Sequence, residues 1–205
     1  MRSSAGRWGS GQIEAVLVRT LLEVFGVTAL LVSSLAGFVA VLRWHDKRRQ
    51  RIWSAAAARM GGELRVEPNW PGVSCAILVE IDGQRVEVRA GRKHEVFATA
   101  AVQHPEGFMM SIHPKPPSWL ASKSPVMTGD PVFDLVFVVE SSDPALCRVW
   151  LDDALRETVS RAGEVWVEVR GGRVLARRTV FDFQEDALDH LARATASIAG
   201  KVAGG

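Results

Sequence analysis

The side chains that most often carry chemistry are few in this chain and widely spaced. The 205 residues include five histidines and two cysteines, and no pair of histidines stands at the HxxxH or HExxH spacing. Zinc sites need ligands at short, regular spacings, so the sequence gives no local support for one. No GxSxG elbow, GxxxxGK[ST] loop or strand-linked GxGxxG is present either. Hydrolase, nucleotide-binding and dinucleotide-binding activities therefore lack their usual apparatus.

The alternative is a catalytic or metal site whose residues are far apart in the sequence and come together only in the folded protein. Its best candidates are His104, His113, Asp130 and Asp134, which lie in and around a proline-rich stretch from His113 to Asp130. Four prolines and weak periodicity predict a loop there. A membrane-tethered enzyme or metal-binding domain at these residues is the second hypothesis; the first is a domain that is not an enzyme and holds no cofactor or metal.

The two cysteines, Cys75 and Cys147, occur in apolar segments that favour a strand and a helix. Free cysteines of this kind usually behave as small buried hydrophobic residues, and burial makes a thiol unreactive. We expect both to be reduced and structural.

The longest apolar stretch is the one feature that decides location. Val24 to Leu42 is a run of nineteen residues without a charge. A helix rises about 1.5 Å per residue, so this run nearly matches a hydrocarbon core of about 30 Å. It exceeds the apolar core of a signal peptide, about 7–15 residues, and no small-residue cleavage site follows it. The run predicts a single transmembrane helix.

Basic residues follow this run and indicate its orientation. Positive charge marks the cytoplasmic side, which puts the N-terminus outside and the C-terminal part in the cytoplasm of a bacterial inner membrane. We expect this segment to lie at the membrane interface and to attract anionic headgroups, without lipid specificity. The interface residues are Arg43, Trp44, Lys47, Arg48, Arg49, Arg51 and Trp53.

Small residues recur along one stripe of the predicted membrane helix, at Gly26, Ala29, Ser33 and Gly37. Such stripes allow two helices to approach closely, so homo-oligomerisation through this helix is one option. The other option is that small residues are simply frequent in membrane helices.

Charge is distributed unevenly along the chain. Residues 60–205 carry 16 basic and 20 acidic groups, although the whole chain has a net charge of +2. The positive balance thus comes from the membrane-flanking cluster, and no nucleic-acid-binding face is expected.

Periodicity along the rest of the chain predicts an α+β fold. Two strand groups, each containing a hairpin, are separated by a helix from about Asp143 to Ala162 and followed by a C-terminal helix. Asp82-Gly83 and Gly171-Gly172 are the hairpin turns, and antiparallel pairing follows from them. The segment Pro131–Glu140 reads as the clearest strand. The predicted division is a flexible N-terminus (1–11), a transmembrane helix (12–43), a basic juxtamembrane helix or linker (44–62) and a cytoplasmic domain (63–202).

One segment resembles a known pattern. Thr128 to Val139 (TGDPVFDLVFVV), with Ser142-Asp143-Pro144 and Leu151–Arg156 after it, is similar to a GDPxFDxxFxV motif of bacterial membrane-anchored proteins of unknown function. Their WxxxAxxxGG-like lead-in matches Trp53–Gly62. The resemblance implies a shared fold and brings no catalytic residues. The motif is expected to be structural through Gly129, Asp130, Pro131, Phe133, Asp134 and Phe137.

Together these patterns predict a single-pass membrane protein whose cytoplasmic domain serves protein interaction or assembly. Its expected partners are the lipid bilayer and a protein that the sequence does not identify.

Overall fold

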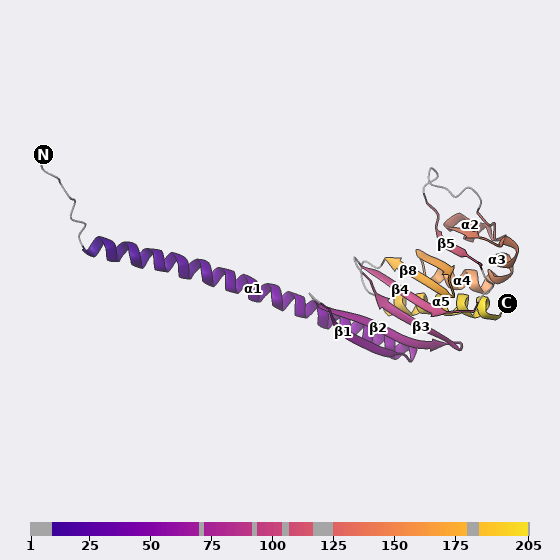
Figure 1. The fold of residues 1–205 in the computed structure, drawn as a ribbon, viewed down its shortest axis with the longest axis horizontal. Helices are drawn as coiled ribbons and strands as arrows, with labels where there is room; N and C mark the ends of the chain where they lie inside the picture. Colours follow the sequence, from indigo (N-terminus) through magenta and orange to yellow (C-terminus); the bar gives the residue numbers. More distant parts are fainter. Residues whose placement is uncertain are drawn as a thin grey trace. The chain divides into compact units, whose positions relative to one another are not determined.

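The computed structural model describes residues 10–69, 72–91, 94–103, 107–116, 125–179 and 185–204. The chain separates into two compact units, Met1–Asp46 and Lys47–Gly205. Helix α1 (Ser10–Met60) begins in the first unit and ends in the second. Figure 1 shows α1 and the strands and helices that follow it.

Helix α1 is continuous through the basic segment that follows the apolar run. No glycine or proline occurs between Leu42 and Met60, so nothing in the sequence interrupts the helix there. Its described part contains a window of mean hydropathy 2.2, none of which is buried within the protein. The helix is thus long and apolar enough to cross a membrane. Large apolar side chains such as Phe25 and Leu30 are each 70% exposed in the protein alone.

The last turns of α1 belong to the second unit. Trp53, Ala56 and Ala57 lie on one face of the helix at spacings of three and four, and all three are buried. Trp53 is 0% exposed, so its assignment to the membrane interface is corrected: it is a core residue of the domain. Gly61 then ends the helix with φ +67°, and the N–H of Gly62 donates to the Ala57 carbonyl at 2.8 Å.

Eight strands form one antiparallel sheet, in the order β1-β2-β3-β4-β8-β7-β5-β6. This confirms the predicted α+β class. The β7–β8 hairpin of the second strand group is inserted between β4 and β5 of the first, by β4–β8 and β5–β7 pairing that no local pattern predicts. The strands are β1 (Glu63–Asn69), β2 (Gly72–Ile81), β3 (Gln84–Ala90), β4 (Glu95–Ala101), β5 (Met110–Pro114), β6 (Phe137–Ser141), β7 (Val165–Arg170) and β8 (Arg173–Thr179).

Both predicted hairpin turns are present. Asp82 and Gly83 have φ values of 52° and 75°, and Gly171 and Gly172 have 57° and 75°. Two successive residues with positive φ are what a two-residue turn between twisted antiparallel strands requires. These turns fix the registers of β2 with β3 and of β7 with β8.

In the part of the chain that the structure describes, four further helices accompany the sheet: α2 (Pro131–Val136), α3 (Pro144–Trp150), α4 (Asp153–Arg161) and α5 (Glu185–Gly204). Helix α5 packs against β3, β4 and β8, and Figure 1 shows it beside these strands. Its buried face includes Leu188, Leu191 and Ile198, which meet the valines and alanines of the sheet.

Two predicted elements are corrected. The expected strand over Pro131–Glu140 begins as helix α2, and only Phe137–Ser141 is extended. Asp130 caps this helix, accepting hydrogen bonds from the backbone N–H groups of Val132 and Phe133, and Pro131 stands at its first position. The cap and proline override the strand propensity of the apolar residues.

The expected helix over Asp143–Ala162 is two helices. Leu151 leaves the helical conformation with ψ 55°, and Asp152 then caps α4 by accepting from the Leu155 N–H. The apolar spacing continues across this break, which is why periodicity alone predicted one helix.

Candidate functional site

One face of the sheet carries no helix among the described residues. Along β7, Val165, Val167 and Val169 point to the helix-covered side and are buried, whereas Trp166, Glu168 and Arg170 point to the other side and are exposed. The same alternation continues on β3, β4 and β8. We call this second side the open face.

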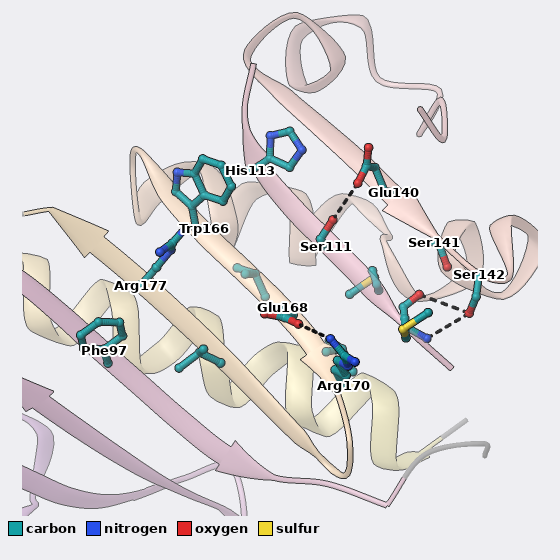
Figure 2. Close-up of a pocket in the computed structure, with 15 residues that line it drawn as sticks. Phe97, Ser111, His113, Glu140, Ser141, Ser142, Trp166, Glu168, Arg170 and Arg177 are labelled. Atoms are coloured by element: carbon teal, nitrogen blue, oxygen red, sulfur yellow. Dashed lines mark hydrogen bonds and ion pairs between the residues drawn. The ribbon is translucent and has the colours of Figure 1, made fainter. Parts of the chain in front are cut away.

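The open face is hollowed over β5, β7 and β8. The hollow has a volume of about 630 Å³. Figure 2 shows the side chains around it, with Ser111 and Glu168 near its middle and Trp166 beside it. Apolar and polar groups are mixed in its lining, which includes Phe97, Met109, Ser111, His113, Glu140, Trp166, Glu168, Arg170, Leu175 and Arg177.

Trp166 is held between two side chains from neighbouring strands. The His113 ring stacks on the indole at 4.9 Å between centroids with 20° between planes. The Arg177 Cζ lies over the indole, 4.7 Å from its centroid. Both faces of the indole are therefore occupied, although the side chain remains 46% exposed.

Phe97 completes the apolar part of the hollow and depends on a glycine. A Cβ atom added at Gly91 would lie 2.2 Å from Cε2 of Phe97, far closer than carbon atoms can approach. Gly91 also donates its N–H to the Glu95 carbonyl at 2.8 Å, closing the end of the β3–β4 pair. The absence of a side chain at position 91 allows the Phe97 ring to lie where it does.

Strand register arranges the open face in rows that cross the strands. In one row, which we call the aromatic row, the charged residues are all arginines. In the next row, which we call the acidic row, they are all glutamates. The aromatic row contains Arg65, Ala76, Arg89, Phe97, Arg177, Trp166 and His113. The acidic row contains Glu63, Leu78, Glu87, Thr99, Leu175, Glu168, Ser111 and Glu140.

The residues proposed for a catalytic or metal site fall in different places. His113 lies in the hollow, and its Nδ1 is 3.1 Å from the Pro114 carbonyl oxygen. Asp130 caps α2, and the Asp134 carboxylate accepts hydrogen bonds from the N–H and hydroxyl of Thr128. His104 lies outside the described residues. Within the described ranges, no three histidine, cysteine, aspartate or glutamate residues are grouped as metal ligands would be.

The GDPxFD segment has structural contacts throughout. Gly129 has φ +88°, which lets the chain turn before the Asp130 cap, and Pro131 begins α2. The rings of Phe133 and Phe137 stack at 4.8 Å, and both are buried. These contacts join α2 to β6.

Arg156 ties α4 to this segment. Its side chain is 13% exposed, its Nε lies 3.5 Å from Asp130 Oδ2, and it also donates to the Leu151 carbonyl and the Asp153 carboxylate. The Phe133 N–H is the main cause that holds the pKa of Asp130 below its usual value. The Val132 N–H and the Arg156 guanidinium act in the same direction, and burial partly opposes them.

This depressed pKa predicts how stability depends on pH. Unfolded Asp130 titrates near a pKa of about 3.9, so its stabilising interactions are complete above that pH and are lost as pH falls through the lower folded-state pKa. We expect Asp130→Asn to make unfolding less pH-dependent below pH of about 4, measured by thermal melts of residues 47–205. Asp82→Asn, at the exposed β2–β3 turn, is the control; an unchanged acid slope in Asp130→Asn would contradict the cap's role.

The cysteines are buried, as Cys75 and Cys147 are each 0% exposed. Burial raises the pKa of the Cys147 thiol to about 11, so this thiol stays protonated at neutral pH and is a poor nucleophile. Its Sγ contacts Sδ of Met110 at 3.5 Å in the core.

Sequence reasoning missed Trp166, Arg177 and Phe97. Trp166 sits at an outward position of a strictly alternating strand, where a large aromatic residue is unusual and marks an exposed apolar site. The sequence therefore contains a signal for Trp166. It contains none for the contacts of Arg177 and His113 with Trp166, because these two residues come from other strands, β8 and β5.

No protein-family model and no curated protein matches the chain. Among solved structures, it is similar to the crystal structure of the mycobacterial trehalose monomycolate transport factor A, TtfA. The TM-score is 0.51 and the identity 12%, over 74% of this chain and 92% of that one. At this identity the similarity establishes the fold alone, over the part of the chain that the match covers.

Proposed function

We propose that this protein is a single-pass protein of the bacterial inner membrane whose cytoplasmic domain binds a protein partner through the open face. The observation that carries the proposal is the open face itself, with its hollow and the stacked Trp166. Exposed tryptophan and arginine side chains in a partly apolar concavity are the usual anchors of protein interfaces.

The anchor is supported by α1. Its apolar run has the length of a bilayer core, and its large apolar side chains are exposed in the protein alone. A water-soluble protein rarely leaves so many apolar side chains uncovered. The basic residues Arg43, Lys47 and Arg48 would then meet anionic headgroups.

The process is proposed from the likeness of fold. The similar structure is named a transport factor for trehalose monomycolate, a lipid, so we place this protein in an assembly that moves lipids in the bacterial envelope. The contacts of the GDPxFD segment, in which Asp130 caps α2 and Phe133 stacks on Phe137, are consistent with a structural module. The alternative, an enzyme or metal site at His113 with Asp130 and Asp134, is weakened because both carboxylates are engaged in local hydrogen bonds.

Orientation gives a prediction of its own. The residues after the apolar run are more basic than those before it, so residues 60–205 should face the cytoplasm. A reporter that is active only in the periplasm, fused after Gly205, should stay silent, while the same reporter fused before Ser10 should be active. Activity of the C-terminal fusion would reverse the orientation.

The function is tested by complementation of a deletion strain. The double variant Trp166→Ala with Arg177→Glu should reach normal membrane levels and fail to restore the strain, because both side chains are exposed and little of the fold depends on them. Arg161→Glu, on exposed α4, should restore it. Replacing residues 10–42 with an unrelated membrane helix should also restore it, whereas residues 47–205 without an anchor should not. Full restoration by the double variant would refute the proposal.

A further inference from the structure

The negative charges of the acidic row all have partners on the open face. Three glutamates contact an arginine on their own strand, and the fourth accepts from a serine. The pairs are Glu63–Arg65 at 3.5 Å, Glu87–Arg89 at 2.5 Å, Glu168–Arg170 at 4.0 Å and Glu140–Ser111 at 3.5 Å. Along this row, an approaching ligand therefore meets carboxylates that are already engaged.

Three arginines on the open face, unlike these glutamates, have no partner of opposite charge among the described residues. Arg85, Arg173 and Arg177 are exposed, and none has a carboxylate within 4.0 Å in the part of the chain that the structure describes. Arg173 and Arg177 are four residues apart on β8 and point to the same side. The open face also carries Glu67, Glu80 and Glu95, and Glu80 is the register partner of Arg85. The unpaired positive charge is therefore local, at Arg173 and Arg177 on β8.

Arg177 is the best positioned of the three. Its guanidinium rests on Trp166, whose other face is held by His113, so its conformation is restricted before any ligand arrives. A guanidinium placed over a ring keeps N–H donors at its edge, where they can bind a carboxylate with two parallel hydrogen bonds. A side chain already ordered loses less entropy on binding.

The part of the hollow beside this cation has apolar side chains in its lining. Phe97 lies opposite Arg177 on the neighbouring strand β4, and Leu175 lies two residues before Arg177 on β8. Met109, which is 49% exposed, also lines the hollow. Methionine adapts its shape to different partners. A matching ligand would carry a negative charge next to an apolar side chain.

The acidic row lies next to the aromatic row, and this arrangement favours a protein over a lipid surface as the ligand that carries the negative charge. A continuous anionic membrane would also press against Glu87, Glu140 and Glu168, at a cost in repulsion. A polypeptide can place one carboxylate over Arg177 and keep the glutamates clear. A bilayer surface also cannot enter a hollow in a sheet.

We propose that the open face binds an acidic, partly apolar segment of a partner protein, with one carboxylate on Arg177 and a neighbouring apolar side chain in the hollow. This inference rests on the proposed function and specifies the chemistry of the partner.

The test is selection from a random displayed peptide library on the full chain in phosphatidylcholine nanodiscs. We expect enriched peptides to combine Asp or Glu with an apolar residue. Arg177→Glu should reduce their binding by at least about tenfold, as removal of one charged partner at an interface does. Arg177→Lys should recover part of it, and Arg161→Glu should leave it unchanged.

Other outcomes overturn the inference. If peptides bind at the face, as shown by their loss in Trp166→Ala, but lack acidic residues or tolerate Arg177→Glu, this inference fails and the proposed function stands. A dye on Met109→Cys that shifts only in phosphatidylglycerol nanodiscs would show lipid on the face and also refute it. If no peptide binds the face and position 109 crosslinks no protein in cells, both proposals fail.

Discussion

Phe137→Ala should lower the free energy of unfolding of residues 47–205 by about 3–5 kcal/mol, the range for removing a buried phenylalanine side chain. Phe137 is 4% exposed and stacks on Phe133 at 4.8 Å. Removing the ring leaves a cavity between α2 and β6 and uncovers the facing ring. Urea unfolding of this compact unit, followed by tryptophan fluorescence, measures the change.

Two variants calibrate this result. Phe137→Leu keeps most of the apolar volume and should cost less than about 1.5 kcal/mol. Val132→Ala on the exposed side of α2, where Val132 is 72% exposed, should change stability by less than about 0.5 kcal/mol. A midpoint in Phe137→Ala equal to that of Val132→Ala would show that the α2–β6 contact is not part of the core.

Leu31→Asp together with Leu35→Asp should prevent membrane integration. Each aspartate near the centre of a spanning helix costs about 2.5–3.5 kcal/mol, so the pair costs about 5–7 kcal/mol. Both leucines lie inside the charge-free run, and both are more than 60% exposed in the protein alone, so no core packing is lost. Extraction of cell membranes with alkaline carbonate should release the double variant and retain the wild type.

Thr20→Asp is the control for that result. It adds a charge to the same helix but lies before the charge-free run, so it should stay in the membrane fraction. Retention of the double variant would mean that α1 does not span, and the location proposed for the domain would have to be abandoned.

Local patterns were sufficient for most of the sheet. Strict alternation in β3 and β7, with Asp82-Gly83 and Gly171-Gly172 as turns, determines both hairpins and which side of each strand is buried. The insertion of the β7–β8 hairpin between β4 and β5 is not predictable in the same way, because the pairing residues are far apart in the chain and no turn connects them.

The wrong prediction at Pro131–Glu140 has a clear physical reason. The run of valine, phenylalanine and leucine has strand propensity, but Asp130 and Pro131 form the same cap-and-proline signal that correctly indicated a helix at Asp143 and Pro144. Short helices depend on their caps, so Asp130 and Pro131 determine the conformation here and override the strand propensity of the residues that follow them.

The candidate site was only partly predictable. The prolines around His113 mark it as a candidate in the sequence, but its contact with Trp166 arises from β5–β7 pairing. The steric dependence of Phe97 on Gly91 also needs coordinates. When the residues of a site come from several strands, the sequence shows which residue types are present, but only the folded structure shows which of them are in contact.

Photocrosslinking in living cells tests the central claim most directly. A photoreactive amino acid replaces Met109 beside the hollow in one strain and Arg161 on α4 in another, each in the full membrane-anchored chain. We predict a discrete protein adduct from position 109 that disappears when Trp166→Ala and Arg177→Glu are added, and none from position 161. Equal adducts from both positions, or no protein adduct from position 109, would contradict binding through the open face.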